Sequence, residues 1–164
     1  MFLDYPILSF IIWFPLLGAC LVLATSKLRP IFIKLLALSI STITFIASIP
    51  LYLNFSLITS EMQYIEKYSW IPSLNVYYYL GIDGISLPLI LLTTFLTPFV
   101  ILSGWQVIKY KPSQYFASFL ILEALMIGVF SALDGLLFYI FWEAMLIPMF
   151  IIIGVWGGDN RIYA

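Results

Sequence analysis

The sequence predicts an all-α membrane protein with about five transmembrane helices. Of its 164 residues, 63% are apolar and only 9% are charged, whereas a typical soluble domain has about 25% charged residues. The seven Lys and Arg residues nearly balance the eight Asp and Glu residues, so no net charge draws nucleic acid to the chain. This composition excludes a soluble globular enzyme, a disordered segment and a nucleic-acid-binding module. The expected environment is a lipid bilayer.

Charged residues divide the chain into five apolar runs. A helix needs about 20 residues to cross the roughly 30 Å hydrocarbon core of a bilayer, and each run is close to that length. Three of the four connections are short, so successive helices are expected to be antiparallel, with their backbone polar groups satisfied within each helix. The expected spans are Ile7–Ala24, Ile31–Leu53, Ile85–Ile108, Gln114–Leu133 and Leu136–Trp156.

The distribution of basic residues predicts the orientation in the membrane. Six of the seven fall on one side of the expected bundle, and only Lys67 falls on the other, together with most acidic residues. Positively charged loops remain on the cytoplasmic side, or on the matrix side in mitochondria. The N-terminus is therefore expected outside. The six residues are Lys27, Arg29, Lys34, Lys109, Lys111 and Arg161, and the acidic residues opposite them are Asp4, Glu61, Glu66, Asp83 and Asp134.

The connection between the second and third spans, Asn54–Gly84, is the only long one. Aromatic and β-branched residues flank the sequence Ser73-Leu74-Asn75, which favours a short hairpin lying at the membrane interface. The alternative is an irregular belt of aromatic residues that only anchors the chain.

Two glutamates, Glu123 and Glu143, are the only acidic residues deep inside the expected spans. A charged side chain at mid-membrane costs roughly 2.5–3.5 kcal/mol on insertion scales, so such residues usually face a protein interior or a water-filled cavity. Counted from the turn at Asp134, they lie about 16 Å and 14 Å into adjacent helices. Both therefore reach nearly the same depth. If the helices face each other suitably, the two carboxyl groups could exchange a proton.

A proton relay is the functional interpretation of this pair, since a buried carboxyl group favours its neutral form until a cation approaches. Pro148 adds to it by freeing the carbonyl of Ala144, next to Glu143, where water could bind. The alternative is that both glutamates are structural. A metal site is not expected, because the chain has no histidine and one cysteine. That residue, Cys20, is interpreted as a small buried side chain.

Three segments resemble one known family. The residues FWEAMLIPM at 141–149, followed by GVWGG at 154–158, resemble the fifth-helix signature of the chain M (chain 4) subunit of proton-translocating NADH:quinone oxidoreductase, respiratory complex I. EALMIGVFSALD at 123–134 is similar to the fourth helix of that subunit, and GIDGISLP at 81–88 to the start of its third. The resemblance covers the chain from about Trp13 onward.

The resemblance implies an antiporter-like proton-channel subunit in a multi-pass membrane complex of the bacterial or mitochondrial inner membrane. Glu143 would work with a lysine on a later helix to gate proton movement, and Glu123 would take part in proton transfer or in coupling to a neighbouring subunit. The implied partners are the other membrane-arm subunits. Flavin, iron–sulfur clusters and quinone would be bound by those other subunits, so no cofactor is expected in this chain.

Length separates this chain from the family pattern, which has about fourteen helices. The chain is expected to be the N-terminal five-helix portion, residues 1–164, without the partner lysine. Two alternatives remain open. One is the large subunit of a multisubunit cation/proton antiporter, and the other is a truncated, inactive membrane segment.

Overall fold

Five long helices make up most of the computed structural model, which describes residues 6–158. All five are long and apolar enough to cross a membrane. Their ends agree with the expected spans to within two residues, which confirms the all-α membrane class. The helices are α1 (Ile7–Ala24), α2 (Pro30–Leu53), α3 (Ser86–Val107), α4 (Pro112–Ser131) and α5 (Gly135–Trp156).

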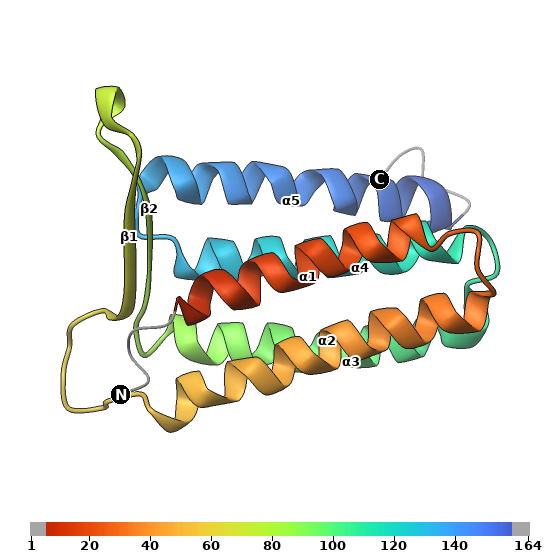
Figure 1. Ribbon diagram of the computed structural model, residues 1–164, viewed down its shortest axis with the longest axis horizontal. Helices are drawn as coiled ribbons and strands as arrows, with labels where there is room; N and C mark the ends of the chain where they lie inside the picture. Colours follow the sequence, from red (N-terminus) through yellow and green to blue (C-terminus); the bar gives the residue numbers. More distant parts are fainter. Residues whose placement is uncertain (1–5, 159–164) are drawn as a thin grey trace.

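The helices lie side by side with their long axes nearly aligned (Figure 1). Residues that favour helix starts define several of the ends. Pro30 and Pro112 open α2 and α4, where a missing N–H costs nothing. Asp134 caps α5 by accepting hydrogen bonds from the N–H groups of Leu136 at 2.9 Å and Leu137 at 3.2 Å.

Helix α4 lies in the interior of the bundle, and α5 lies on its surface. In the most apolar stretch of each helix, 56% of the α4 residues are buried but only 17% of the α5 residues. The two helices approach closely at Gly128, where an added Cβ would lie 2.8 Å from the ring of Phe141. Only glycine leaves space for that ring, so Gly128 allows α5 to pack on α4.

The connection between α2 and α3 contains a β-hairpin, as the aromatic pattern predicts. Strand β1 (Gln63–Ile71) pairs in antiparallel fashion with β2 (Val76–Ile82). A 3₁₀ turn at Pro72–Leu74 joins them, and Asn75 then takes a left-handed conformation with φ of 56°, which Asn tolerates better than most residues. The hairpin lies across one end of the helix bundle (Figure 1).

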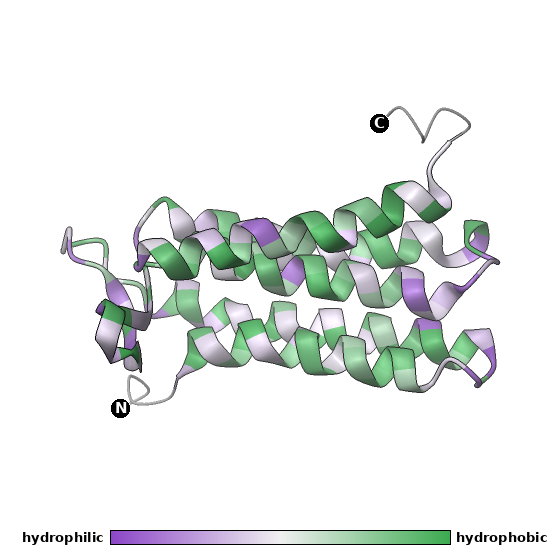
Figure 2. Cartoon of the chain, turned by 90° about the horizontal axis from the view of Figure 1, so that it is seen from above, coloured by the Kyte–Doolittle hydropathy of each residue, from purple (hydrophilic) through white to green (hydrophobic). Residues whose placement is uncertain are grey.

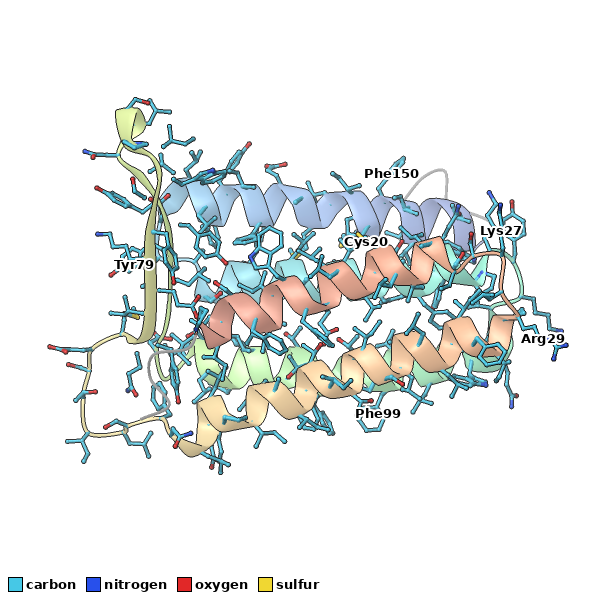
Figure 3. The ribbon with its side chains drawn as sticks, in the orientation of Figure 1. Cys20, Lys27, Arg29, Tyr79, Phe99 and Phe150 are labelled. Atoms are coloured by element: carbon cyan, nitrogen blue, oxygen red, sulfur yellow. The ribbon has the colours of Figure 1, made fainter. Side chains whose placement is uncertain are left out.

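Polar residues gather at the two ends of the bundle, and apolar residues cover most of its length (Figure 2). Lys27 and Arg29 lie at the end opposite Tyr79 of the hairpin (Figure 3). This separation agrees with the basic and acidic sides expected from the sequence, while the direction of insertion stays a prediction. Asp4 and Arg161, which contributed to that expectation, lie outside the described residues.

One detail differs from expectation. Cys20, interpreted as a small buried side chain, is exposed. Pro88 lies in the first turn of α3, where its missing N–H has no helical partner to lose.

The buried interior consists of two apolar clusters separated by polar residues. The hairpin-side cluster includes Leu51, Ile90 and Ile127, and the far cluster includes Ile40, Ile101 and Leu120. Between them, on α2, α3 and α4, lie buried polar side chains that we call the polar layer. Its members are Ser41, Thr44, Ser48, Thr93, Thr94, Thr97 and Glu123.

Candidate functional site

Glu123, on α4, is completely buried. Neither of its carboxyl oxygens has a hydrogen-bond partner among the described residues. Thr97 on α3 lies near the carboxyl group but does not hydrogen bond to it, because the Thr97 hydroxyl donates its hydrogen to the Thr93 carbonyl at 2.9 Å. An unpaired carboxyl group in an apolar interior is costly, so this residue is a strong candidate for function.

The hydroxyl groups of the polar layer bond mainly to their own helices. On α2, Thr44 donates to the Ile40 carbonyl at 3.0 Å, and Ser48 donates to the Phe45 carbonyl at 2.7 Å. Across the helix pair, the hydroxyl oxygens of Ser48 and Thr94 lie 2.9 Å apart. One hydroxyl pair, Ser48 and Thr94, therefore joins α2 to α3 within the polar layer.

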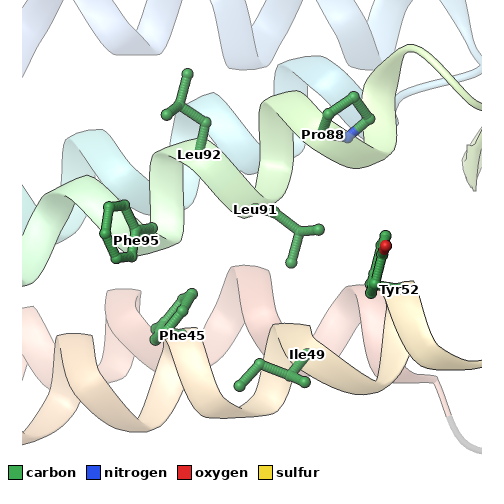
Figure 4. Close-up of a pocket in the computed structure, with 7 residues that line it drawn as sticks. All are labelled: Phe45, Ile49, Tyr52, Pro88, Leu91, Leu92 and Phe95. Atoms are coloured by element: carbon green, nitrogen blue, oxygen red, sulfur yellow. The ribbon is translucent and has the colours of Figure 1, made fainter.

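The outer side of the same helix pair is entirely different. A groove of about 420 Å³ lies between α2 and α3 and is lined by apolar and aromatic side chains. Figure 4 shows its members: Phe45, Ile49, Tyr52, Pro88, Leu91, Leu92 and Phe95. Along this groove, α2 and α3 therefore have an outer face that is mostly apolar, while the hydroxyl groups of the polar layer lie on their buried side.

Glu143, on α5, is exposed in the described part of the chain. The buried residues of α5 are Leu137, Phe141 and Pro148, and these face the bundle. Glu143 follows Phe141 by two residues, which turns it about 200° away from that ring around the helix. Its carboxyl group therefore points away from α4 and toward the outside of the five-helix bundle.

The two glutamates lie at equal depth but in different surroundings. Glu123 is eight residues before the end of α4 at Ser131, and Glu143 is eight residues after the start of α5 at Gly135, so each is about 12 Å along its helix. No hydrogen bond between them occurs in the described residues. The structure therefore does not place them as a facing pair.

A second groove lies between α4 and α5, with a volume of about 250 Å³. Ala144 and Pro148 contribute to its wall, and nearly all of its lining is apolar. The carbonyl that Pro148 frees is thus beside a small space, while the Glu143 side chain lies on the other side of the helix.

Glu66, in β1, has a role that the sequence does not reveal. It is buried, and its carboxylate accepts hydrogen bonds from the N–H of Leu8 at 2.8 Å, from the N–H of Ser9 at 3.1 Å and from the Ser9 hydroxyl. Pro6, which precedes α1, supplies no side-chain cap. Glu66 therefore caps α1 from the hairpin, where its negative charge also suits the positive end of the helix dipole.

The other strand of the hairpin attaches to the turn between α4 and α5. The Tyr77 N–H donates to the Asp134 carboxylate at 3.1 Å, and the Leu133 N–H donates to the Tyr79 carbonyl at 2.8 Å. The Tyr77 bond is the main reason that the pKa of Asp134 lies below its ordinary value, and the bond from Leu137 adds to it. These contacts fix the hairpin to both α1 and α5.

Among residues 6–158, no group of three or more His, Cys, Asp or Glu side chains comes together as a metal site would require. The polar layer and the exposed carboxyl group of Glu143 are thus the candidate sites for proton transfer in the spanning region.

Comparison with known proteins assigns the family. Residues 7–131 match the family described as NADH-ubiquinone oxidoreductase chain 4, amino terminus. The chain belongs to this family. It is 48% identical to NADH-ubiquinone oxidoreductase chain 4 of Arabidopsis thaliana over 154 residues, which cover 94% of this chain and 31% of the relative. It is also 40% identical to NADH-quinone oxidoreductase subunit M of Rickettsia typhi, with 99% and 34% covered.

The fold also matches a solved structure, that of respiratory complex I from Thermus thermophilus with bound NADH. The TM-score is 0.78 at 23% sequence identity, and the match covers 95% of this chain and 30% of the other. The chain thus spans about a third of the length of the relatives that it matches.

Proposed function

We propose that the chain forms part of the proton-translocating membrane arm of an NADH:quinone oxidoreductase, with Glu143 as the central proton acceptor and Glu123 as a second protonatable group. Membership of the chain 4 family and the five membrane-crossing helices support the proposal. The partners are the other membrane-arm subunits and the lipid bilayer. Flavin, iron–sulfur clusters and quinone are bound by other subunits, and this chain takes the proton-transfer role.

The exposed mid-depth position of Glu143 is the observation that carries the proposal. A carboxylate facing lipid at this depth would cost roughly 2.5–3.5 kcal/mol, so the face that bears Glu143 requires a polar partner. The relatives are about three times as long as this chain, and their additional helices are the natural source of that partner. A lysine there would complement the carboxylate.

The mechanism is electrostatic. When the lysine ammonium group approaches Glu143, it stabilises the ionised carboxylate. When the lysine withdraws, the neutral form is favoured and Glu143 takes up a proton from the cytoplasmic side, or the matrix side in mitochondria. When the lysine returns, Glu143 ionises again and releases its proton to the next protonatable group of the full-length subunit, so each cycle moves a proton without a redox centre in this chain.

The test is a Glu143→Gln variant of the full-length subunit in the assembled complex. Gln keeps the size of the side chain but cannot ionise, so proton pumping should fall about tenfold or more, as expected for loss of an essential proton carrier. The subunit should still insert and assemble. Glu61→Gln, the same change in the exposed loop before β1, is the matched control. Normal pumping by the Glu143→Gln complex would exclude the proposal.

A further inference from the structure

The polar layer is enclosed on both sides by apolar clusters. On α2, its residues fall between Ile40 of the far cluster and Leu51 of the hairpin-side cluster. On α3, they fall between Ile90 and Ile101. On α4, Glu123 follows Leu120 of the far cluster and precedes the residues of the hairpin-side cluster. The Glu123 carboxyl group is therefore shut off from both ends of the bundle.

No cation of the spanning helices faces this carboxyl group. Among the described residues of α1 to α5, the charged side chains other than Glu123 are Lys34 and Glu143. Lys34 donates to the Trp105 carbonyl near the far end of α3, and Glu143 points out of the bundle. The charge of an ionised Glu123 would thus be unbalanced by any described group on the helices that pack against α4.

The hydrogen-bond donors in the layer are already used. The single hydroxyl hydrogen of Thr97 goes to the Thr93 carbonyl, so the Thr97 oxygen can only accept from Glu123. An ionised carboxylate is itself only an acceptor, whereas a neutral carboxyl group has one O–H to donate. Pro98, inside α3, adds to the excess of acceptors, because it has no N–H to donate to the Thr94 carbonyl.

We infer that the polar layer is a closed proton-binding site, in which Glu123 is a neutral carboxylic acid whose O–H is positioned by the oxygen of Thr97. Glu123 is the group that holds the proton, and Thr97 is a positioning residue. The inference rests on the proposed function for its place in proton transfer and deepens it. It makes Glu123 a proton store separate from Glu143, not the facing partner of Glu143.

Infrared difference spectroscopy of the full-length subunit in its assembled membrane complex tests this inference. At neutral pH, the wild type minus Glu123→Gln spectrum should contain the carbonyl stretching band of one protonated carboxyl group. Thr97→Val removes the accepting oxygen with little change of shape, so it should shift that band to higher frequency. Thr97→Ser restores an oxygen and should return the band to its original position.

Thr42→Val is the matched control. Thr42 lies on α2, as Ser48 does, but it is only half-buried, and its hydroxyl donates to the Leu38 carbonyl outside the polar layer. It should leave the band unchanged. A carboxylate band in place of the carbonyl band would overturn the inference, and an unchanged band in Thr97→Val would overturn the role of Thr97. If the Glu123→Gln complex does not assemble, the Thr97→Val minus wild type spectrum tests the inference by the same shift of the carbonyl band. Normal pumping by Glu143→Gln would remove the proposed function and leave this band in place.

Discussion

Helices α4 and α5 each have one glutamate at the same depth, yet the two side chains have opposite surroundings. Glu123 is enclosed by hydroxyl groups and two apolar clusters, whereas Glu143 is on the outer face of a helix that is mostly exposed. Equal depth therefore does not make them equivalent. The difference arises from the rotation of each helix about its axis, which decides whether a side chain points into the bundle or out of it.

The two glutamates also differ in whether the five helices alone provide their surroundings. Glu123 is completely buried among the described residues, so the properties of this carboxyl group are set within the five helices. Glu143 lies on a surface that the described residues leave uncovered, and in the proposed function groups outside them balance its charge. One glutamate thus lies in the interior of the five-helix bundle, and the other lies on its outer face.

The largest effect is expected at the contact that holds α5 on α4. Gly128→Val would bring a branched side chain into the space of the Phe141 ring, which already lies 2.8 Å from a built Cβ. Overpacking of this kind costs about 1–3 kcal/mol. In the full-length subunit, the free energy of unfolding measured by SDS titration in mixed micelles should fall by that amount. The shift of α5 should reduce proton pumping through Glu143.

The control for this prediction is Gly135→Ala at the start of α5, where an added Cβ meets nothing within 4 Å. It should leave both stability and pumping unchanged. If Gly128→Val also removed the infrared band of Glu123, the two glutamates would not be as independent as the comparison states.

A smaller effect is expected at the hairpin contact on the α1 side. Glu66→Ala removes the only side-chain cap of α1 that the described residues provide, leaving the N–H groups of Leu8 and Ser9 without their acceptor. Loss of an N-cap costs about 0.5–2 kcal/mol. Hydrogen exchange of the first turn of α1 should accelerate accordingly. Glu61→Ala, in the exposed loop before β1, should have no such effect, and equal exchange rates in the two variants would contradict the capping role.

The helices could be predicted closely from the sequence, but the packing of their faces could not. Apolar length alone locates a membrane-spanning helix, because the bilayer sets the required length. Every helix here is also apolar around most of its circumference, so hydrophobic periodicity does not show which side is buried. For this reason the equal depth of Glu123 and Glu143 was predictable from residue counting, whereas their opposite orientations were not.

The spacing of the polar-layer residues in the sequence indicated a shared helix face, but only weakly. Ser41, Thr44 and Ser48 follow helical spacing, as do Thr93, Thr94 and Thr97, so each set was identifiable as one face of a helix. Ser and Thr are common in membrane helices because they can bond to their own backbone, and spacing does not show that two such faces meet. The contacts of Glu66 were out of reach for another reason, since they join residues nearly sixty positions apart.

The smallest effect is expected at the hairpin contact on the α5 side, and it depends on pH. Backbone hydrogen bonds, first from Tyr77 and then from Leu137, hold the pKa of Asp134 below its ordinary value, which is about 3.9 in unfolded chains. A lowered folded-state pKa means that this carboxylate stabilises the fold above the unfolded pKa, and that the stabilisation is lost as the pH falls through the folded pKa. Exchange of the Tyr77 amide, corrected for its intrinsic rate, should therefore be constant from neutral pH to about pH 4 and accelerate below it.

Asp134→Asn provides the decisive variant for this contact. Asn remains a good N-cap for α5, but with one acceptor oxygen it cannot also serve Tyr77, so the Tyr77 amide should exchange faster at neutral pH and lose its acid dependence. Asp83→Asn is the matched control, since the pKa of Asp83 is also lowered, mainly by the backbone hydrogen bond from Ser86, yet Asp83 contacts the start of α3 and not Tyr77. Unchanged Tyr77 exchange in Asp134→Asn would show that the Leu133 to Tyr79 bond alone attaches β2, and that the hairpin holds α5 through the backbone and not through a charge.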